Sequence, residues 1–131
     1  MAKETKVPEH LRYTAEHEWV RVEGKVATLG ITDYAQDALT DVVFVELPDV
    51  GESFKHGDSM GVVESTKSVS DIYAPVSGKI VEVNTALEDK PELLNDDPYG
   101  EGWFAKIEMS DPSEAGKLLD AAGYRKTIEN A

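Results

Sequence analysis

Lys67 is the residue whose type and position most clearly suggest chemistry. No other lysine or arginine lies between Lys55 and Lys79. A free lysine has a pKa of about 10.4 and is a poor nucleophile at neutral pH, so a Schiff-base role would require burial or a cationic neighbour. The nearby carboxylates of Glu64 and Asp71 favour the charged ammonium instead. This pattern indicates a lysine that a modifying enzyme acylates, set against the common alternative of a charge that serves solubility alone.

Two β-type runs flank Lys67 and are expected to hold it at the tip of a hairpin. The first is SMGVVEST at 59–66, and the second is SDIYAP at 70–75, after which Gly78 marks another turn. The backbone at such a tip is accessible to an enzyme, while the strands keep the lysine at a fixed position. An acyl arm of eight carbons on this lysine would reach about 12–15 Å.

The rest of the chain predicts a mostly β fold with short helices. Regular turns between many short strands are typical of a flattened antiparallel barrel or sandwich. A glycine turn followed by a valine-rich strand on each side of Lys67 indicates two halves related by a pseudo-two-fold axis. We expect a hairpin over 17–32, strands at 41–47, 79–84 and 102–109, and helical segments at 32–39, 89–94 and 111–130.

Several of these elements carry specific expectations. The run at 41–47 is continuously apolar and is expected to be a well-buried strand. In the helix at 32–39, Thr32 or Asp33 is the expected cap, and Ala35, Ala38 and Leu39 form the expected apolar face. The final helix is expected to start with an Asp111–Glu114 capping pair, to bury Ala115, Leu118, Leu119 and Ala122, and to close at Gly123.

Composition limits the class of function. The chain of 131 residues suits one domain, 1–131, whose first ten residues are expected to be loose. A net charge of −13 disfavours nucleic acid and anionic membranes as partners, because both require lysine and arginine. It leaves open an encounter with basic clefts or a role in solubility alone. The N-terminus lacks the apolar stretch of a secretory signal, so a cytoplasmic protein is expected. We also expect the chain to be a monomer.

Metal and cofactor motifs are missing from the sequence. Without cysteine there are no disulfides or thiolate metal sites, and the three histidines, His10, His17 and His56, lack metal-ligand spacing. Trp19 and Trp103 are expected to fill the core or its rim. A free-standing enzyme would also need a general base beside a nucleophile, and no such pair is evident.

The segment around Lys67, VESTKSVSDIYAPVSGKI, closely resembles the lipoyl-lysine segment of the glycine cleavage system H proteins. Tips of 2-oxoacid dehydrogenase lipoyl domains tend to read Asp-Lys-Ala and those of biotin carriers Met-Lys-Met, whereas this tip reads Thr-Lys-Ser. The similarity extends from about Tyr13 to Tyr124. The further matching blocks, in the family's order, are HEWV, ATLGITDYAQ, DVVFVELPDVG, VEVN and NDDPYGEGWFAKI.

The resemblance implies a barrel-sandwich fold of the lipoyl-biotinyl type and a non-catalytic carrier with lipoate in amide linkage on Lys67. It implies that a lipoylating enzyme recognises Glu64, Gly51 and Gly78. The expected partners are the glycine-decarboxylating P-protein, the aminomethyl-transferring T-protein and the L-protein, which reoxidises the arm. The alternative is a lipoyl carrier or lipoate relay for another complex of the 2-oxoacid dehydrogenase type.

By the same resemblance, Glu16, Glu18 and Asp71 belong to a groove that shelters the aminomethyl group. Carboxylates at short range would hold its cationic nitrogen. Judged by position alone, Glu18 could instead be a strand carboxylate on a wet face and Asp71 a turn residue. Some family members have a small polar residue where Glu16 stands and a histidine where Ala38 stands.

Overall fold

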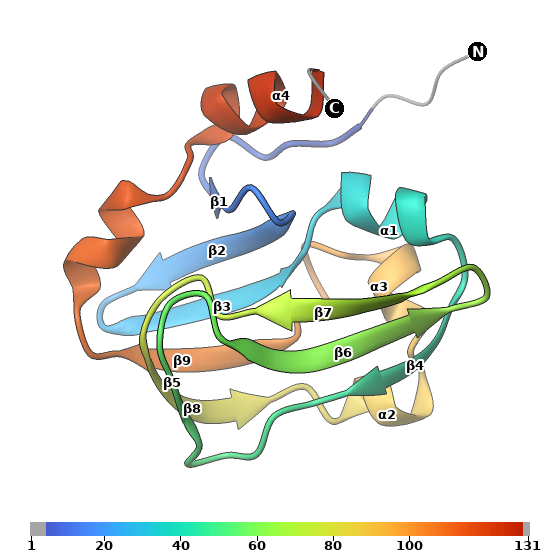
Figure 1. Cartoon of the computed structure of the whole chain (residues 1–131), viewed down its shortest axis with the longest axis horizontal. Helices are drawn as coiled ribbons and strands as arrows, with labels where there is room; N and C mark the ends of the chain where they lie inside the picture. Colours follow the sequence, from blue (N-terminus) through green and yellow to red (C-terminus); the bar gives the residue numbers. More distant parts are fainter. Residues whose placement is uncertain (1–4, 130–131) are drawn as a thin grey trace.

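The strands of the chain form two antiparallel sheets in the computed structural model, which describes residues 5–129 (Figure 1). The larger sheet contains, in spatial order, β1 (Arg12–Tyr13), β2 (Glu18–Glu23), β3 (Val26–Ile31), β9 (Ala105–Met109), β8 (Gly78–Val83) and β5 (Ser53–Phe54). The smaller sheet contains β4 (Val42–Glu46), β6 (Ser59–Ser65) and β7 (Val69–Tyr73). The predicted flattened antiparallel sandwich is confirmed, and the described strands do not close into a barrel.

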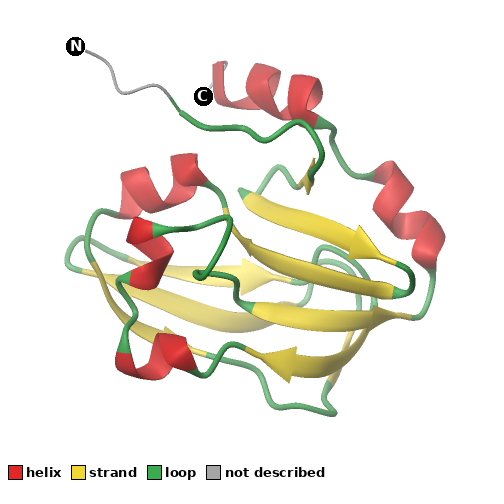
Figure 2. Ribbon diagram, turned by 180° about the vertical axis from the view of Figure 1, so that it is seen from behind, coloured by secondary structure: helices red, strands yellow, loops and turns green. Residues whose placement is uncertain are grey.

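Short helices cover the ends of the sandwich. They are α1 (Asp33–Leu39), α2 (Ala86–Asp89), α3 (Leu93–Asp96), the 3₁₀ helix η1 (Pro112–Lys117) and α4 (Ala121–Glu129). The first three gather at the end where the turn between β6 and β7 lies, as the front and rear views agree (Figures 1 and 2). The predicted single turn at 89–94 is instead two short helices, with Pro91 between them.

The main core lies between the two sheets. Leu29 and Ile107 face it from the larger sheet, and Val45, Val63 and Ile72 face it from the smaller one. Full burial of one such side chain contributes about 1.5–3 kcal/mol. In β9, which confirms the strand expected at 102–109, the side chains alternate: Ala105, Ile107 and Met109 are buried, whereas Glu108 is exposed.

A second, smaller core joins the N-terminal segment to α4. Its fully buried aromatic residues are Tyr13, Trp19 and Tyr124. Part of the N-terminal segment that was expected to be loose is held here: Val7 is buried in this core, the Tyr13 hydroxyl donates to the Pro8 carbonyl, and Arg125 donates to the Val7 carbonyl. Residues 1–4 lie outside the described residues.

The expectation of a well-buried strand at 41–47 is wrong for its middle. Val43 is 55% exposed and Phe44 49% exposed. β4 is an edge strand of a sheet that buries only one face, so alternate side chains point to solvent. A β-bulge between Val42 and Phe44 leaves two neighbouring apolar residues on the outside.

Two predicted helices differ in their details. Thr32 does cap α1 by accepting a hydrogen bond from Ala35 N, but Ala38 is exposed, and Gln36 is buried in its place. The predicted helix at 111–130 is interrupted, because the residues between η1 and α4 run as extended chain and Leu119 pairs with β1. As a result Gly123 lies inside α4 rather than at its end, and Ala122 is exposed.

Candidate functional site: the Lys67 turn and the Glu18 pocket

Lys67 lies at the tip of the hairpin formed by β6 and β7, as the sequence predicted. The Ser65 side chain organises the turn, since its Oγ accepts hydrogen bonds from Lys67 N at 3.1 Å and Ser68 N at 3.0 Å. The backbone closes through Ser65 N and Ser68 O at 2.8 Å. The turn therefore presents an exposed lysine on a backbone whose hydrogen bonds are satisfied locally.

The hairpin tip rests against the connection between α1 and β4. Thr66 N donates to the Asp41 carbonyl at 3.0 Å, and the Thr66 and Thr40 hydroxyls lie 3.2 Å apart. The Lys67 Nζ donates to the Ala38 carbonyl at 3.4 Å. These contacts fix the position of the tip while its amine stays on the surface.

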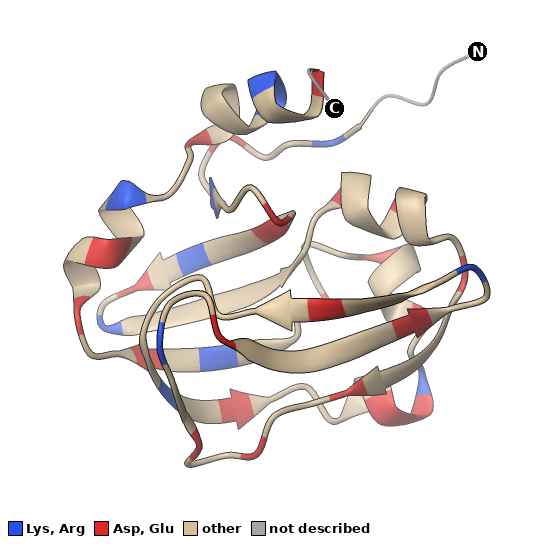
Figure 3. Ribbon diagram, viewed as in Figure 1, with Lys and Arg blue, Asp and Glu red and all other residues tan. Residues whose placement is uncertain are grey.

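Lys67 is the only lysine or arginine of the hairpin formed by β6 and β7, and both strands of this hairpin carry an acidic position (Figure 3). Glu64 pairs with Phe44 on one side and with Val69 on the other, so the three side chains form a row across the outer face. Val69 is 64% exposed.

Gly51 precedes β5, and Gly78 begins β8, where it pairs with Phe54 of β5. Strand β5 lies at the other end of the molecule from the turn between β6 and β7 (Figure 1). Gly51 has a φ of +95°, which favours glycine, and its N–H donates to Ile80 O at 2.8 Å. A Cβ on Gly78 would collide with the carbonyl oxygen of Glu108. The local backbone conformation therefore explains why glycine occupies each of these two positions, independently of the turn that carries Lys67.

Glu18 is a buried carboxylate near the far end of β7. Its side chain accepts hydrogen bonds from the Thr14 hydroxyl at 2.6 Å and from Tyr73 N at 3.1 Å. Burial raises the pKa of Glu18 to about 7, although these hydrogen bonds oppose the shift. The reading of Glu18 as a strand carboxylate on a wet face is therefore wrong.

A cavity of about 380 Å³ opens beside Glu18, and we call it the Glu18 pocket. Its lining residues are Thr14, Ala15, Glu16, Glu18, His56, Gly57, Tyr73 and Ala74. Strand β7 runs from the turn that carries Lys67 to Tyr73, so one edge strand connects the exposed amine with this pocket. The pocket offers two carboxylates, one exposed and one buried, within mainly apolar walls.

Of the three groove residues expected from the sequence, the structure brings two together. Glu16 and Glu18 both line the Glu18 pocket, but Asp71 does not. Because Ile72 points into the core, its neighbour Asp71 points outward, and it accepts a hydrogen bond from Ser59 Oγ at 3.3 Å.

Sequence reasoning missed Thr14 and Tyr73. The Thr14 hydroxyl accepts from the N–H groups of Glu16 and Glu18, at 3.2 and 3.1 Å, and so organises the turn before β2. A threonine two positions before Glu16 is a recognisable turn signal. Tyr73 contributes through its backbone, and no sequence pattern indicates that β7 meets β2.

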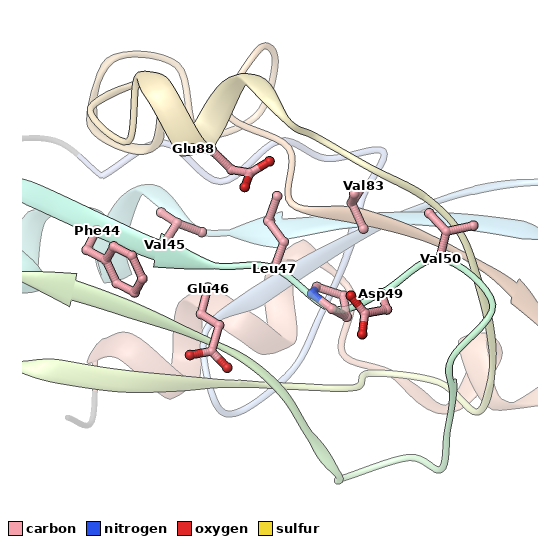
Figure 4. Close-up of a pocket in the computed structure, with 9 residues that line it drawn as sticks. Phe44, Val45, Glu46, Leu47, Asp49, Val50, Val83 and Glu88 are labelled. Carbon is pink, nitrogen blue, oxygen red and sulfur yellow. The ribbon is translucent and has the colours of Figure 1, made fainter.

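A second cavity of about 440 Å³ lies beside β4 (Figure 4). Glu88 lies on its α2 side, the apolar side chains of Val45 and Leu47 point toward Glu88, and Glu46 points away from Glu88 (Figure 4). Its charged lining residues are all acidic. It holds no pair of base and nucleophile that would indicate catalysis.

The described part of the chain contains neither a cluster of metal-ligand side chains nor a helix that could span a membrane. Among residues 5–129, no group of three or more His, Asp or Glu side chains is arranged to hold a metal ion. None of the helices within that range has the length and apolar character needed to cross a bilayer. His17, one of the three histidines, contacts Tyr34 and Tyr124 rather than a metal-type partner.

Comparison with known proteins identifies the family. A model described as the glycine cleavage H-protein family matches residues 11–131. This chain belongs to the glycine cleavage H-protein family. The resemblance seen in the sequence is thereby confirmed over nearly the whole chain.

Individual relatives agree with the family match. The glycine cleavage system H protein of Symbiobacterium thermophilum is 62% identical over 118 residues, 90% of this chain and 92% of the relative. That of Anaeromyxobacter sp. (strain K) is 58% identical over 123 residues, covering 94% and 96%. The crystal structure of a glycine cleavage system H protein from Mycobacterium marinum superimposes with a TM-score of 0.87 at 45% identity, covering 94% of this chain and 99% of that one.

Proposed function

We propose that this chain is a lipoylated carrier of the glycine cleavage system. It would pass the aminomethyl group of glycine from the P-protein to the T-protein, and the L-protein would reoxidise it. The observation that carries the proposal is an exposed lysine, Lys67, at the tip of a locally stabilised hairpin in a chain of this family. The chain itself would be non-catalytic, monomeric and cytoplasmic.

Lys67 would hold the prosthetic group through an amide bond to its Nζ. When bound, lipoate supplies a dithiolane whose sulfur accepts the aminomethyl group. The fit of the site rests on three features of Lys67: its side chain is exposed, its turn is fixed by Ser65, and its amine donates a long hydrogen bond, 3.4 Å, to the Ala38 carbonyl. An enzyme can therefore reach the amine without unfolding the hairpin.

Recognition by the lipoylating enzyme would use the surroundings of this turn. Glu64 presents a carboxylate on the outer face next to Val69. Gly51 and Gly78 would act at a distance, by permitting the backbone shape before β5 and the close packing of β8 on β9.

Glu16 and Glu18 would hold the cationic nitrogen of the aminomethyl group in the Glu18 pocket. A carboxylate in a partly dry pocket attracts an ammonium more strongly than one in water. Asp71 would contribute on the outer side of β7, on the way from Lys67 to the pocket. Apolar walls would limit the access of water and so slow hydrolysis of the loaded form.

Lipoylation at Lys67 is the test of this proposal. We expect the intact mass to rise by one lipoyl increment in the presence of a lipoylating enzyme, and Lys67→Arg to abolish both that increment and glycine cleavage in a reconstituted system. The matched control is Lys25→Arg, because Lys25 is also exposed at a hairpin turn, between β2 and β3. Glycine cleavage by folded Lys67→Arg protein would refute the assignment, and activity only with 2-oxoacid dehydrogenase partners would favour the alternative carrier.

A further inference from the structure

The turn that carries Glu16 and Glu18 has a strained residue at its centre. His17 has a φ of +72°, in the left-handed region that residues other than glycine rarely adopt. Its backbone is fixed on both sides, since His17 N donates to Thr14 O at 3.2 Å and Thr32 N donates to His17 O at 3.1 Å. A residue in this conformation persists only where its surroundings hold it.

The surroundings of the His17 side chain come from the C-terminal helix. The Tyr124 hydroxyl lies 2.8 Å from His17 Nδ1 and 2.7 Å from the Thr32 hydroxyl. Thr32 in turn accepts from Ala35 N, as the cap of α1. One buried hydroxyl therefore ties α4 to the imidazole beside Glu18 and to the start of α1.

The donor directions along this chain of hydrogen bonds are consistent with a neutral imidazole. Burial lowers the pKa of His17, so its Nδ1 is available as an acceptor. The Tyr124 hydroxyl can then donate to Nδ1 and accept from the Thr32 hydroxyl. Each hydroxyl proton on this path has an acceptor.

Tyr124 is itself rigidly placed. Its ring is fully buried and stacks on Tyr13, with centroids 4.6 Å apart and planes at 11°. Tyr13 is tied through its backbone N–H and carbonyl to Leu119. The hydroxyl of Tyr124 thus has little freedom to follow His17 if the turn relaxes.

We propose that Tyr124 is a positioning residue for the Glu18 pocket. Through its hydroxyl it holds His17 in the left-handed conformation and thereby keeps the Glu16 and Glu18 carboxylates aimed into the cavity. The consequence for activity rests on the proposed function, because the pocket would shelter the aminomethyl group. The C-terminal helix, which contributes no lining residue to the pocket, would then control how long the loaded form survives.

Tyr124→Phe is the variant that tests this role, because it removes the hydroxyl and keeps the ring. We expect the lifetime of the aminomethylated form to fall about five-fold, the loss typical of one hydrogen bond, with the rate of lipoylation at Lys67 unchanged. Tyr34→Phe is the first control, since Tyr34 touches the same imidazole only through its ring. Ile128→Ala is the second, because it loosens the packing of α4 without touching the hydroxyl.

A measurement on the unmodified protein separates this inference from the carrier role. By NMR, Tyr124→Phe should change the Nδ1 signal of His17 and lower the pKa of Glu18 toward 4.5, as the carboxylate gains access to water. In the two control variants, Tyr34→Phe and Ile128→Ala, the Nδ1 signal of His17 and the pKa of Glu18 should stay as in the wild-type protein. Unchanged His17 and Glu18 signals, or equal changes in Ile128→Ala, would overturn the positioning role, whereas the absence of aminomethyl loading in the wild-type protein would count only against the proposed function.

Discussion

At the scale of single residues, Glu18 is the group most altered by the fold. It begins a strand, yet the cavity beside it and the two hydrogen bonds to its carboxylate make it unlike the exposed carboxylates that dominate this acidic chain. A buried carboxyl with a raised pKa is mainly protonated below pH 7 when the pocket is empty. A cationic group in the pocket would favour the ionised form, so loading would release a proton near neutral pH.

Glu18→Gln should change how stability depends on pH. The folded pKa of Glu18 is raised from 4.5 to about 7, so the folded wild-type protein binds more protons than the unfolded chain between these values, and its unfolding free energy falls as pH rises. Glutamine does not titrate, so the Glu18→Gln variant lacks this decrease in unfolding free energy. Urea unfolding should show the difference between Glu18→Gln and wild type increasing by about 2–3 kcal/mol from about pH 5 to about pH 8.

The control for this experiment is Glu16→Gln, which makes the same change of charge at an exposed position of the same turn. A difference between Glu18→Gln and wild type that stays constant over this pH range would show that Glu18 is ionised throughout. The hydrogen bond that glutamine cannot reproduce lowers the stability of the variant equally at each pH, so it does not affect the slope.

At the scale of elements, β8 packs so closely on β9 that it depends on a residue without a side chain. Gly78 pairs with Met109, and a Cβ there would meet the Glu108 carbonyl and, at 2.6 Å, the Ile107 side chain. Backbone cannot move aside as a flexible side chain can. The start of β8 therefore tolerates no side chain without a shift of the neighbouring strand.

Gly78→Ala should lower the unfolding free energy by about 1–3 kcal/mol, the usual cost of overpacking. Gly116→Ala is the matched control, since nothing lies within 4 Å of the Cβ it would add, and it should be close to neutral. Thermal or urea unfolding of the two variants measures the difference. Equal stabilities would mean that β8 and β9 separate at little cost, and Gly78 would then owe its presence to recognition alone.

Local signals were sufficient for the elements that the sequence predicted correctly. The β6–β7 hairpin and the Thr32 cap each depend on residues within a few positions of one another. Contacts distant in sequence explain the rest. The exposure of Phe44 depends on which strand β4 pairs with, and the interruption before α4 depends on Leu119 meeting Tyr13.

The same distinction holds for the site. The isolation of Lys67 is visible in the sequence, and so is the turn that carries it. The Glu18 pocket is not, because it forms where β2 meets the end of β7 and its key donor, Tyr73 N, is a backbone group that every non-proline residue has. Asp71 shows the same limit, because it lies on the strand that leads to the pocket but is not one of the residues that line it.

At the scale of the whole molecule, a net charge of −13 is spread over both sheets (Figure 3). Ion pairs within residues 5–129, such as Arg21–Glu23 and Arg125–Glu9, are largely exposed. Exposed pairs of this kind contribute little to stability. The excess charge therefore acts mainly at a distance, either on partner proteins or on other copies of the chain.

The KM of the P-protein for the lipoylated chain distinguishes these two roles of the charge. If the charge guides the chain to a basic cleft, KM should rise about 3- to 10-fold between roughly 20 and 200 mM salt, because the Debye length shortens over this range, while kcat stays constant. Chlorides of different monovalent cations at equal ionic strength provide the control against specific ion binding. A KM that does not respond to salt would mean that the carboxylates keep the chain soluble and take no part in the encounter. The reason is that salt screens the long-range attraction between a chain of charge −13 and a basic surface, so such an attraction must weaken as ionic strength rises.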